Sequence, residues 1–443
     1  MVRLATPIVI VQLGWMAMPV VDTIVMGRVS AVALAAVALG SLYAYVASVA
    51  GIGVIMSLDP IVSQAVGAKD EPAVARALQR GIVLALAAGL LATPMALPAG
   101  TVLRLLGQDP AVARLAEHYV WITFTGLVPL YLYFAMRQTL QALGHLAAVV
   151  MTMVAANVIN LALNWVLVFG HLGAPALGVA GSALATSISR WLMALLLLAF
   201  GWRRLKGYLR PWLPDSIARR PLAAMVRIGL PISLQWELEF GAFAVIGLLM
   251  GAMGPVSMAG HQVALNLASV TFMVPNGVSG AAAILVGRAV GRGDAREVRR
   301  AAAAALVCGI AFMAGTSALM LALPGFFARL YTTKADVAAV AAMLIPIAGF
   351  FQVFDGTQVV SIGILRGVGD TRTPMLVNIL GFWLVGVPVS WYVGVRGGGG
   401  PQGLWWGLTV GLVVVAVVLL LRVRAKLSGD LARVSVDGDV PSA

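Results

Sequence analysis

The sequence has very little of what a soluble enzyme or a secreted domain needs. Cys308 is the only cysteine, so neither an intramolecular disulfide nor a cluster of cysteine metal ligands can form. Charged residues make up only 11% of the 443-residue chain, and hydrophobic residues make up 61%. This balance excludes a soluble globular protein of this length, and we expect no redox chemistry.

Signatures of catalysis are also missing. The sequence contains no H-E-x-x-H, no G-x-S-x-G and no Walker A lysine loop. Gly398, Gly400 and Gly403 match G-x-G-x-x-G, but they fall in a predicted outer loop with no buried strand before it, so we interpret the match as coincidence. We therefore expect no enzyme and no cofactor. Because the sequence contains no ATP-binding loop, energy for any work by this chain has to come from an ion gradient, with Na+ or H+ as the coupling ion.

What the chain does have is a series of long apolar stretches. A helix needs roughly 20 apolar residues to cross a lipid bilayer. The stretches between charged or Gly/Pro-rich breaks predict an all-α polytopic membrane protein with twelve transmembrane helices. The predicted spans are residues 5–27, 33–63, 80–103, 116–138, 147–170, 176–200, 226–250, 256–285, 301–326, 337–362, 374–395 and 402–424.

The net charge of +13 is distributed unevenly along the chain. If the N-terminus is cytoplasmic, most lysines and arginines fall in cytoplasmic segments, which is the positive-inside bias. We therefore expect a multi-pass protein of the plasma (inner) membrane with both termini in the cytoplasm. The densest basic cluster follows the sixth span, and it indicates contact with anionic lipid headgroups rather than nucleic acid. Its members are Arg203, Arg204, Lys206, Arg210, Arg219, Arg220 and Arg227.

The two halves of the chain resemble each other. AVGAKD at residues 65–70 recurs as AVGRGD at 289–294, and LQALGH at 140–145 recurs as LRGVGD at 365–370, with offsets of 224 and 225 residues. Because each repeat holds an even number of spans, the copies are parallel repeats about an axis along the membrane normal. We expect an N-terminal bundle at residues 1–202 and a C-terminal bundle at residues 226–425. A basic cytoplasmic linker at 203–225 joins them, and a disordered cytoplasmic tail follows at 426–443.

Three carboxylates interrupt the apolar stretches: Asp22, Glu239 and Asp355. An acidic residue near the middle of a bilayer costs ~2.5 to 3.5 kcal/mol, so it normally faces a cavity and handles ions, protons or substrate. The pattern therefore predicts a transporter. Glu237 lies about 200° around the helix from Glu239, so only one of the two can face a given cavity, and the pattern alone does not choose between them.

Asp22 follows two prolines in the first span. Pro7 and Pro19 each remove a backbone donor, which makes this span the most easily bent helix of the first half and predicts a conformational hinge. A carboxyl group held away from water favours its neutral form, so Asp22 is a candidate proton carrier. The alternative is a structural aspartate that accepts hydrogen bonds from a neighbouring helix.

Three amides in the fifth span, Asn157, Asn160 and Asn164, have i, i+3, i+7 spacing and share one helical face. They could hold a carboxylate or a hydrated ion, or act only as polar contacts between helices. In the tenth span, Phe351 lies one turn before Asp355, and its ring could pack beside that acid or against a bound cation. Arg190, in the sixth span, could pair with an acid or extend to an interface.

At these residues the sequence resembles the multidrug and toxic compound extrusion (MATE) family, and most closely its NorM-type branch. The motifs that carry the resemblance are VDTIVMGR at 21–28, AGHQVALN at 259–266 and LRGVGDTRTP at 365–374, supported by LQALGH and by NLALNWVLVFG at 160–170. The resemblance covers roughly residues 3 to 425. It implies a V-shaped pair of six-helix bundles that exports amphipathic, often cationic, compounds in exchange for Na+ or H+.

In the first half, the resemblance implies that Asp22 is the family's acid of the first helix. Asn160 and Asn164 match its polar neighbours in the fifth helix, and Pro7 matches the kink-forming proline. Asn164 stands where one branch of the family has a second aspartate. The resemblance therefore implies ion coupling or protonation at Asp22, Asn160 and Asn164.

In the second half, Glu239 matches the glutamate of the seventh helix and Asp355 the aspartate of the tenth, which favours Glu239 over Glu237. This pair is the candidate Na+ site. Phe351 stands where NorM-type members commonly have a tyrosine, and the missing hydroxyl favours H+ coupling or a water-filled Na+ site. The implied substrate cleft is lined by Asp22, Gln262, Phe351 and Asp355.

The sequence thus predicts a secondary active antiporter, a monomer in the lipid bilayer, that exports small cationic drugs or toxic compounds by alternating access. A flippase for lipid-linked saccharides is the first alternative, but a pyrophosphate carrier favours a basic cavity, whereas the predicted intramembrane charges are mostly acidic. A membrane-embedded enzyme is the second alternative, disfavoured because the four histidines fall in separate segments: His118, His145, His171 and His261.

Overall fold

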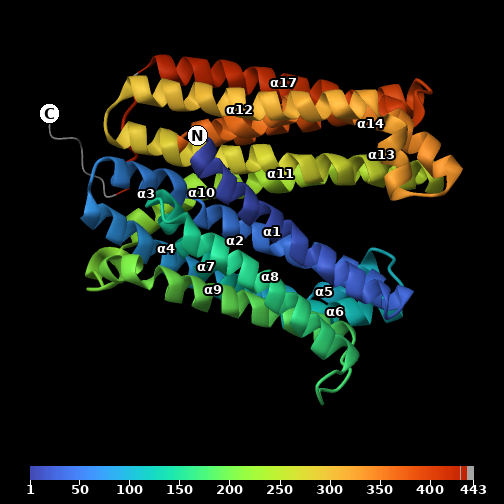
Figure 1. Ribbon diagram of the computed structural model, residues 1–443, viewed down its shortest axis with the longest axis horizontal. Helices are drawn as coiled ribbons and strands as arrows, with labels where there is room; N and C mark the ends of the chain where they lie inside the picture. The colour runs from blue at the N-terminus through green and yellow to red at the C-terminus, as the bar shows by residue number, and fades with distance from the viewer. Residues whose placement is uncertain (430, 437–443) are drawn as a thin grey trace. The chain divides into compact units, whose positions relative to one another are not determined.

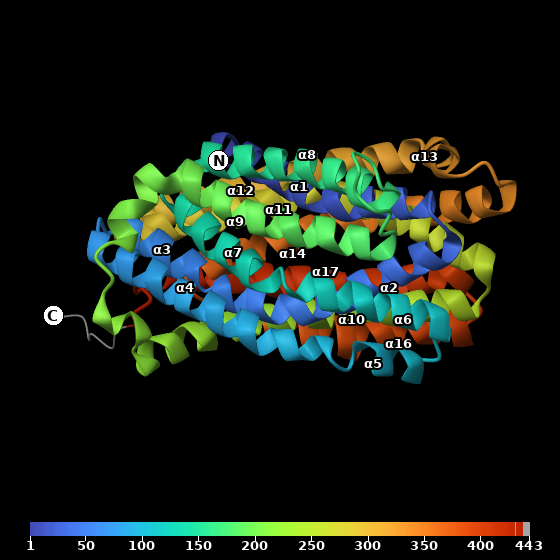
Figure 2. The ribbon, with the colours of Figure 1, turned by 90° about the horizontal axis from the view of Figure 1, so that it is seen from below.

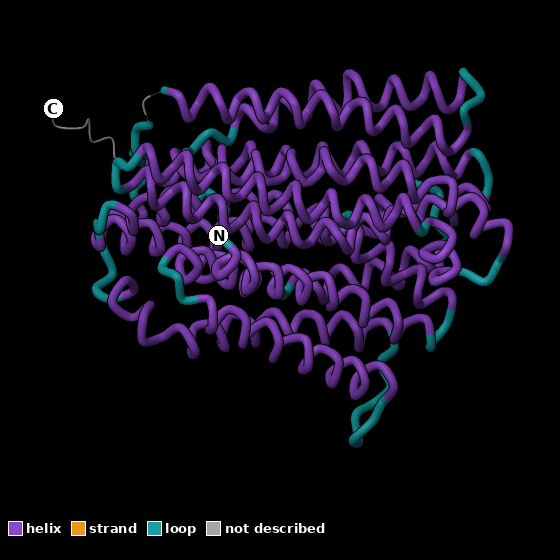
Figure 3. The backbone as a smooth tube through the Cα atoms, turned by 45° about the horizontal axis from the view of Figure 1, so that its top comes forward, coloured by secondary structure: helices purple, strands orange, loops and turns teal. Residues whose placement is uncertain are grey.

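The computed structural model describes residues 1–429 and 431–436, and this part of the chain is helical with no strand (Figure 3). The α-helices are α1 (Val2–Gly27), α2 (Ala31–Ile55), α3 (Leu58–Gly67), α4 (Glu71–Ala92), α5 (Ala99–Leu105), α6 (Pro110–Phe124), α7 (Leu127–Ala142), α8 (Leu146–Phe169), α9 (Val179–Leu209), α10 (Arg219–Ala252), α11 (Pro255–Gly291), α12 (Ala295–Ala322), α13 (Pro324–Tyr331), α14 (Ala335–Gly367), α15 (Arg372–Asn378), α16 (Val387–Trp391) and α17 (Gly400–Ser428). The 3-10 helices are η1 (Thr93–Ala96) and η2 (Pro214–Ile217), and the π-helices are η3 (Ile379–Gly386) and η4 (Tyr392–Arg396).

The helices account for the predicted membrane spans. Within the described residues, eleven helical segments are long and apolar enough to cross a membrane, and the pair α6 and α7 forms a twelfth span that is bent by 48°. The bend occurs at Gly126, where α9 approaches so closely that an added Cβ would lie 2.9 Å from Cδ of Arg190. The prediction of an all-α polytopic membrane protein is confirmed.

The helices form two compact units. The N-terminal unit holds Ile10–Ser233, and the C-terminal unit holds Met1–Val9 and Leu234–Val434. The two boundaries fall inside helices α1 and α10, and each lies two residues after a proline, Pro7 or Pro231. These prolines are 224 residues apart, which is the offset of the sequence repeat.

Glycines explain why the start of α1 packs in the C-terminal unit and the start of α10 packs in the N-terminal unit. In the C-terminal unit, an added Cβ at Gly277 of α11 would lie 2.4 Å from Cγ2 of Val9. In the N-terminal unit, an added Cβ at Gly53 of α2 would lie 2.3 Å from Oγ of Ser233, and that hydroxyl donates a 2.7 Å hydrogen bond to the carbonyl of Ala50. Small residues thus allow the close helix contacts that drive association in membranes.

The repeated motifs form the same turns in both units. Lys69 and Gly293 have left-handed φ angles of 56° and 69°. The side chain of the next residue, Asp70 or Asp294, then accepts the backbone N–H three residues on, at 3.0 and 2.8 Å, and caps the following helix. The basic segments 69–80 and 292–300 contain these caps. Because the caps start helices that continue without a break, these segments are the first turns of α4 and α12.

Within each unit the helices pack side by side. In the C-terminal unit, α11, α12 and α17 all contact α14, and Figure 1 shows the four running alongside one another. In the N-terminal unit, α8 lies along α9 and α7 contacts α4 and α9, as Figures 1 and 2 show. Large apolar side chains such as Leu90, Leu91 and Leu248 are exposed on the outside, as expected for a surface in contact with lipid.

The connection between α9 and α10 is fixed to the N-terminal unit by two neighbouring side chains of α4, Gln79 and Arg80, and Nη2 of Arg80 binds Oδ2 of Asp215 at 3.1 Å. Gln79 of α4 is fully buried. Its Nε2 donates to the carbonyls of Tyr208 and Pro211 at 2.8 and 2.9 Å, and its Oε1 accepts from the Leu213 N–H and the Ser216 hydroxyl at 2.8 and 2.7 Å. The connection is therefore held along much of its length. The predicted disordered tail, from residue 426, lies partly outside the described residues, and α17 reaches Ser428.

Candidate functional site

The first candidate site is centred on Asp22, in α1 of the N-terminal unit. Asp22 is only 4% exposed. Its Oδ1 accepts a 2.8 Å hydrogen bond from Nδ2 of Asn164 in α8, and its Oδ2 accepts a 3.0 Å hydrogen bond from the hydroxyl of Thr186 in α9. Burial of a carboxyl group is costly unless hydrogen bonds compensate for the lost water. Three helices therefore converge on one acid and stabilise it.

The amides of α8 divide between two tasks. Asn160 and Asn164 are fully buried, and Nδ2 of Asn164 also donates to the carbonyl of Asn160 at 3.0 Å. Among the described residues, Nδ2 of Asn160 and Oδ1 of Asn164 have no hydrogen-bond partner, so one donor and one acceptor are available beside Asp22. Asn157 instead donates to the carbonyl of Gly14 at 3.0 Å and joins α8 to α1.

Arg190 of α9 lies near Asp22 but binds elsewhere. Its Nη1 donates a 3.2 Å hydrogen bond to the carbonyl of Thr123, close to the bend between α6 and α7. Its charge is still near enough to act on Asp22 and on the buried ring of Tyr119. The structure thus places a cation near the acid, bound to the backbone carbonyl of Thr123.

The second candidate site is centred on Glu239, in α10 of the C-terminal unit. Its Oε1 accepts a 3.1 Å hydrogen bond from Nε2 of Gln358 in α14, and its Oε2 accepts a 3.2 Å hydrogen bond from Nδ2 of Asn378 in α15. Both amides are buried, and their oxygens, Oε1 of Gln358 and Oδ1 of Asn378, have no partner within the described part of the chain. Oxygen atoms of this kind suit hard cations.

Asp355 belongs to the same site. It lies on α14 one turn before Gln358, is 8% exposed, and is close enough to Glu239 for the two charges to act on each other. Two carboxylates that lie this close to each other favour a shared proton or a bound cation, because either relieves their repulsion. The structure therefore brings together the two acids that the sequence singled out in the second half.

An irregular helix holds Asn378 in position. The π-helix η3 begins at the residue after Asn378, and Nε1 of Trp383 within it donates a 2.9 Å hydrogen bond to the carbonyl of Leu238, next to Glu239. An added Cβ at Gly381 of η3 would lie 2.1 Å from Cγ2 of Val415, so this segment lies very close to α17. Short π-helical segments occur frequently at functional sites.

Phe351 packs its ring against two other aromatic rings. Its ring is 2% exposed and lies edge to face against Phe243 at 6.0 Å and against Trp405 at 5.8 Å. The ring thus forms an apolar wall one turn from Asp355. Within the described residues, no group of three or more histidine, cysteine or acidic side chains could hold a metal ion.

Comparison with known proteins decides the family. The MatE family model matches residues 7–166 and 231–392, which are corresponding parts of the two halves. The chain belongs to the MatE family. Two of the relatives of this MATE protein are the "Probable multidrug resistance protein NorM" of Agrobacterium fabrum and the "Multidrug resistance protein NorM" of Burkholderia vietnamiensis. Both are 35% identical, over 95% and 97% of this chain and 92% and 94% of the relatives.

Solved structures of MATE transporters share the two-bundle fold. The eukaryotic MATE transporter AtDTX14 matches with a TM-score of 0.86 at 24% identity, covering 95% of this chain and 94% of that chain. A MATE protein in the bent conformation matches with a TM-score of 0.86 at 21% identity, covering 96% and 94%. The resemblance stated from the sequence motifs is confirmed, and this MATE protein is a transporter rather than an enzyme.

The sequence predicted some members of the two sites and missed others. Asp22, Asn160 and Asn164 come together in one unit, and Glu239 and Asp355 in the other, while their roles remain predictions. Gln262 of α11 is exposed and joins neither cluster, and one carboxylate oxygen of Glu237 is buried without a partner among the described residues. The members that were missed are Thr186, Gln358 and Asn378. Each is a polar residue inside an apolar span, and that signal could have found them.

Proposed function

We propose that this MATE transporter is a secondary active multidrug efflux antiporter, which exports amphipathic organic cations in exchange for Na+ or H+. The observation that carries the proposal is that each unit has its own acidic site, with Asp22 in one unit and Glu239 with Asp355 in the other. The names of the relatives, which are multidrug resistance proteins, support the same function.

The C-terminal site has the composition of a Na+ site. Glu239 and Asp355 would supply carboxylate oxygens, and the unpartnered amide oxygens of Gln358 and Asn378 would complete the set. A cation there would offset the repulsion between the two acids. A single proton shared by the two carboxylates would have the same electrostatic effect, so the geometry supports either coupling ion.

The N-terminal site suits a proton or the positive charge of a substrate. Asp22 has a hydrogen-bond donor on each oxygen, and the Arg190 charge lies nearby. Neutralisation of Asp22 removes its attraction for a cationic substrate, and this would release the substrate. The acidic character of both sites supports export of cations over a flippase for lipid-linked saccharides, which favours basic groups.

Alternating access requires that the units move as bodies joined by bendable helices. The boundaries between the units lie inside α1 and α10, next to Pro7 and Pro231. Since each proline lacks a backbone donor, both helices can bend there at low cost. We include Pro231 as a hinge beside the predicted Pro7 and Pro19, and we place the protein as a monomer in the inner membrane with both termini cytoplasmic.

Transport by purified protein in liposomes tests this function. Efflux of a fluorescent organic cation is followed after a Na+ gradient or an H+ gradient is imposed separately, for the native chain and for Asp22→Asn, Glu239→Gln and Asp355→Asn. We expect export to fall at least about tenfold in each variant, the factor that corresponds to ~1.4 kcal/mol. Asp109→Asn is the control, because Asp109 is an exposed helix cap and asparagine also caps. Undiminished gradient-driven export in all three variants contradicts the proposal.

A further inference from the structure

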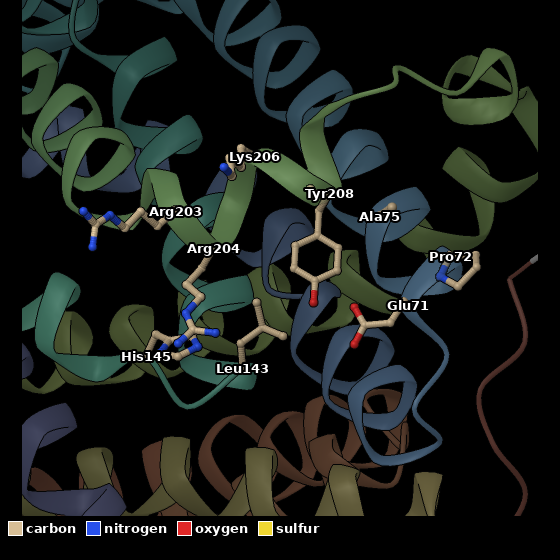
Figure 4. Close-up of a pocket in the computed structure, with 10 residues that line it drawn as sticks. Glu71, Pro72, Ala75, Leu143, His145, Arg203, Arg204, Lys206 and Tyr208 are labelled. Atoms are coloured by element: carbon tan, nitrogen blue, oxygen red, sulfur yellow. The ribbon is translucent and has the colours of Figure 1, made fainter.

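A pocket of about 660 Å³ lies in the N-terminal unit, and no residue of either acidic site lines it (Figure 4). Three segments of that unit line it: the start of α4, the turn between α7 and α8, and the last turns of α9. The polar side chains that line it are Glu71, His145, Arg203, Arg204, Lys206 and Tyr208. Its volume falls within the roughly 300 to 1,000 Å³ of small-ligand pockets.

The pocket has an excess of positive charge. Arg203, Arg204 and Lys206 are basic, and none of these side chains makes a hydrogen bond or ion pair with any residue that the structure describes. Figure 4 places Arg204 and His145 on one side of the pocket. The charge of these three cations is therefore available to an external anion.

The single acid of the pocket is already engaged. Figure 4 shows the hydroxyl of Tyr208 facing the carboxylate of Glu71, and the two side chains are hydrogen-bonded. This pair lies across the pocket from Arg204. Glu71 therefore weakens the attraction for an anion but does not neutralise the three cations.

The position of the pocket along α9 corresponds to the edge of the bilayer. The apolar run of α9 ends at Phe200, and the exposed ring of Trp202 follows immediately before the basic residues. Tryptophan and tyrosine side chains collect at membrane interfaces, and lysine and arginine just beyond an apolar span contact anionic headgroups. Leu143 adds an apolar wall to the pocket.

We propose that this pocket binds the phosphate group of an anionic phospholipid at the membrane surface. Guanidinium and ammonium groups donate charge-assisted hydrogen bonds to phosphate oxygens, and the apolar wall together with the adjacent lipid-facing surface accommodates the acyl end. The bound lipid would connect α4, α7 and α9 at one end of the N-terminal unit. The shared chemistry is a phosphate ester, which free phosphorylated solutes also offer.

Native mass spectrometry of the full chain in a neutral detergent tests the proposal. The protein is mixed with phosphatidylglycerol, with phosphatidylcholine, or with glycerol 3-phosphate as the soluble source of the same group. We expect phosphatidylglycerol to bind at least about tenfold more tightly than either of the others. The combined Arg203→Gln, Arg204→Gln and Lys206→Gln variant should lose this preference.

The control variant combines Arg219→Gln, Arg220→Gln and Arg227→Gln. These three exposed arginines lie at the start of α10, outside the pocket, so the control removes the same charge and should keep the preference. A loss of folding cannot imitate a gain in affinity, so Glu71→Gln provides an independent test. Removal of the one acid should raise phosphatidylglycerol affinity about fivefold.

Three results would overturn the proposal. The first is equal binding of phosphatidylglycerol by the native chain and the pocket variant. The second is glycerol 3-phosphate binding as tight as that of the lipid, which would make the pocket a site for a soluble ligand. The third is no gain, or a loss, in the Glu71→Gln variant.

Discussion

Nδ2 of Asn164 lies 2.8 Å from Oδ1 of Asp22, and the same nitrogen lies 3.0 Å from the carbonyl oxygen of Asn160. One amide group therefore connects the acid of α1 to the backbone of α8. Because the hydroxyl of Thr186 occupies the other carboxylate oxygen, Asp22 is held from two sides. A change of charge at Asp22 must alter the contacts among three helices of the N-terminal unit.

The first prediction concerns this contact. Asn164→Leu keeps the branched shape of the side chain and removes the donor, so Asp22 is left with one buried oxygen unsatisfied. We expect the protein to lose about 1–3 kcal/mol of stability, measured as a lower thermal unfolding temperature in detergent, and to lose export in liposomes. Asn266→Leu is the control, since the exposed Asn266 donates a hydrogen bond to the carbonyl of Gln262 in its own helix. An unchanged unfolding temperature in Asn164→Leu contradicts the prediction.

The second prediction concerns Na+. If Glu239 and Asp355 bind Na+ with the help of Gln358 and Asn378, NaCl should stabilise the native chain more than choline chloride at equal ionic strength. A ligand at a hundred times its dissociation constant adds ~2.7 kcal/mol, which a thermal unfolding scan detects. The Na+ effect should disappear in Asp355→Asn and remain in Asp22→Asn, whose site lies in the other unit. An equal Na+ effect in both variants would assign the ion elsewhere, and no effect in the native chain would leave H+ as the coupling ion.

The third prediction concerns the prolines at the unit boundaries. Pro7→Ala and Pro231→Ala restore a backbone donor at the points where α1 and α10 pass between units. We expect slower export with unchanged or higher thermal stability, because interior prolines destabilise a helix by ~3 kcal/mol in water. Pro19→Ala tests the other predicted hinge. Native export rates in both Pro7→Ala and Pro231→Ala would exclude these two boundaries as hinges.

The fourth prediction concerns the connection between α9 and α10. Gln79→Ala removes four hydrogen bonds to the segment from Tyr208 to Ser216, and we expect a loss of about 2–4 kcal/mol. Trypsin should also cut faster at Lys206 and Arg219, the two sites that flank the released segment. Gln402→Ala, at an exposed position near the start of α17, should change neither measurement. Trypsin cleavage at the native rate in Gln79→Ala would show that other contacts hold the connection.

Much of the candidate site could be predicted from the sequence because charged groups are rare in it. Asp22, Glu239 and Asp355 stood out against apolar spans. Because a carboxylate in lipid is costly, such residues indicate a functional site even from the sequence alone. Pro231 was missed although it follows Pro7 at the repeat offset. Gln358 was missed although it lies one turn from Asp355 on the same helix. In both cases the distance along the sequence, 224 residues from Pro7 and one helical turn from Asp355, could have identified the residue.

The sequence by itself determined the membrane location of the helices, their number and the repeat, because hydropathy and the satisfaction of backbone hydrogen bonds in lipid act along the chain. Only the tertiary structure decided the partners of each acid. Asn164 meets Asp22, Asn378 meets Glu239, and the ring of Phe351 turns to Phe243 and Trp405. Such contacts depend on how helices far apart in the sequence rotate and pack, and helical periodicity specifies only which residues share a face.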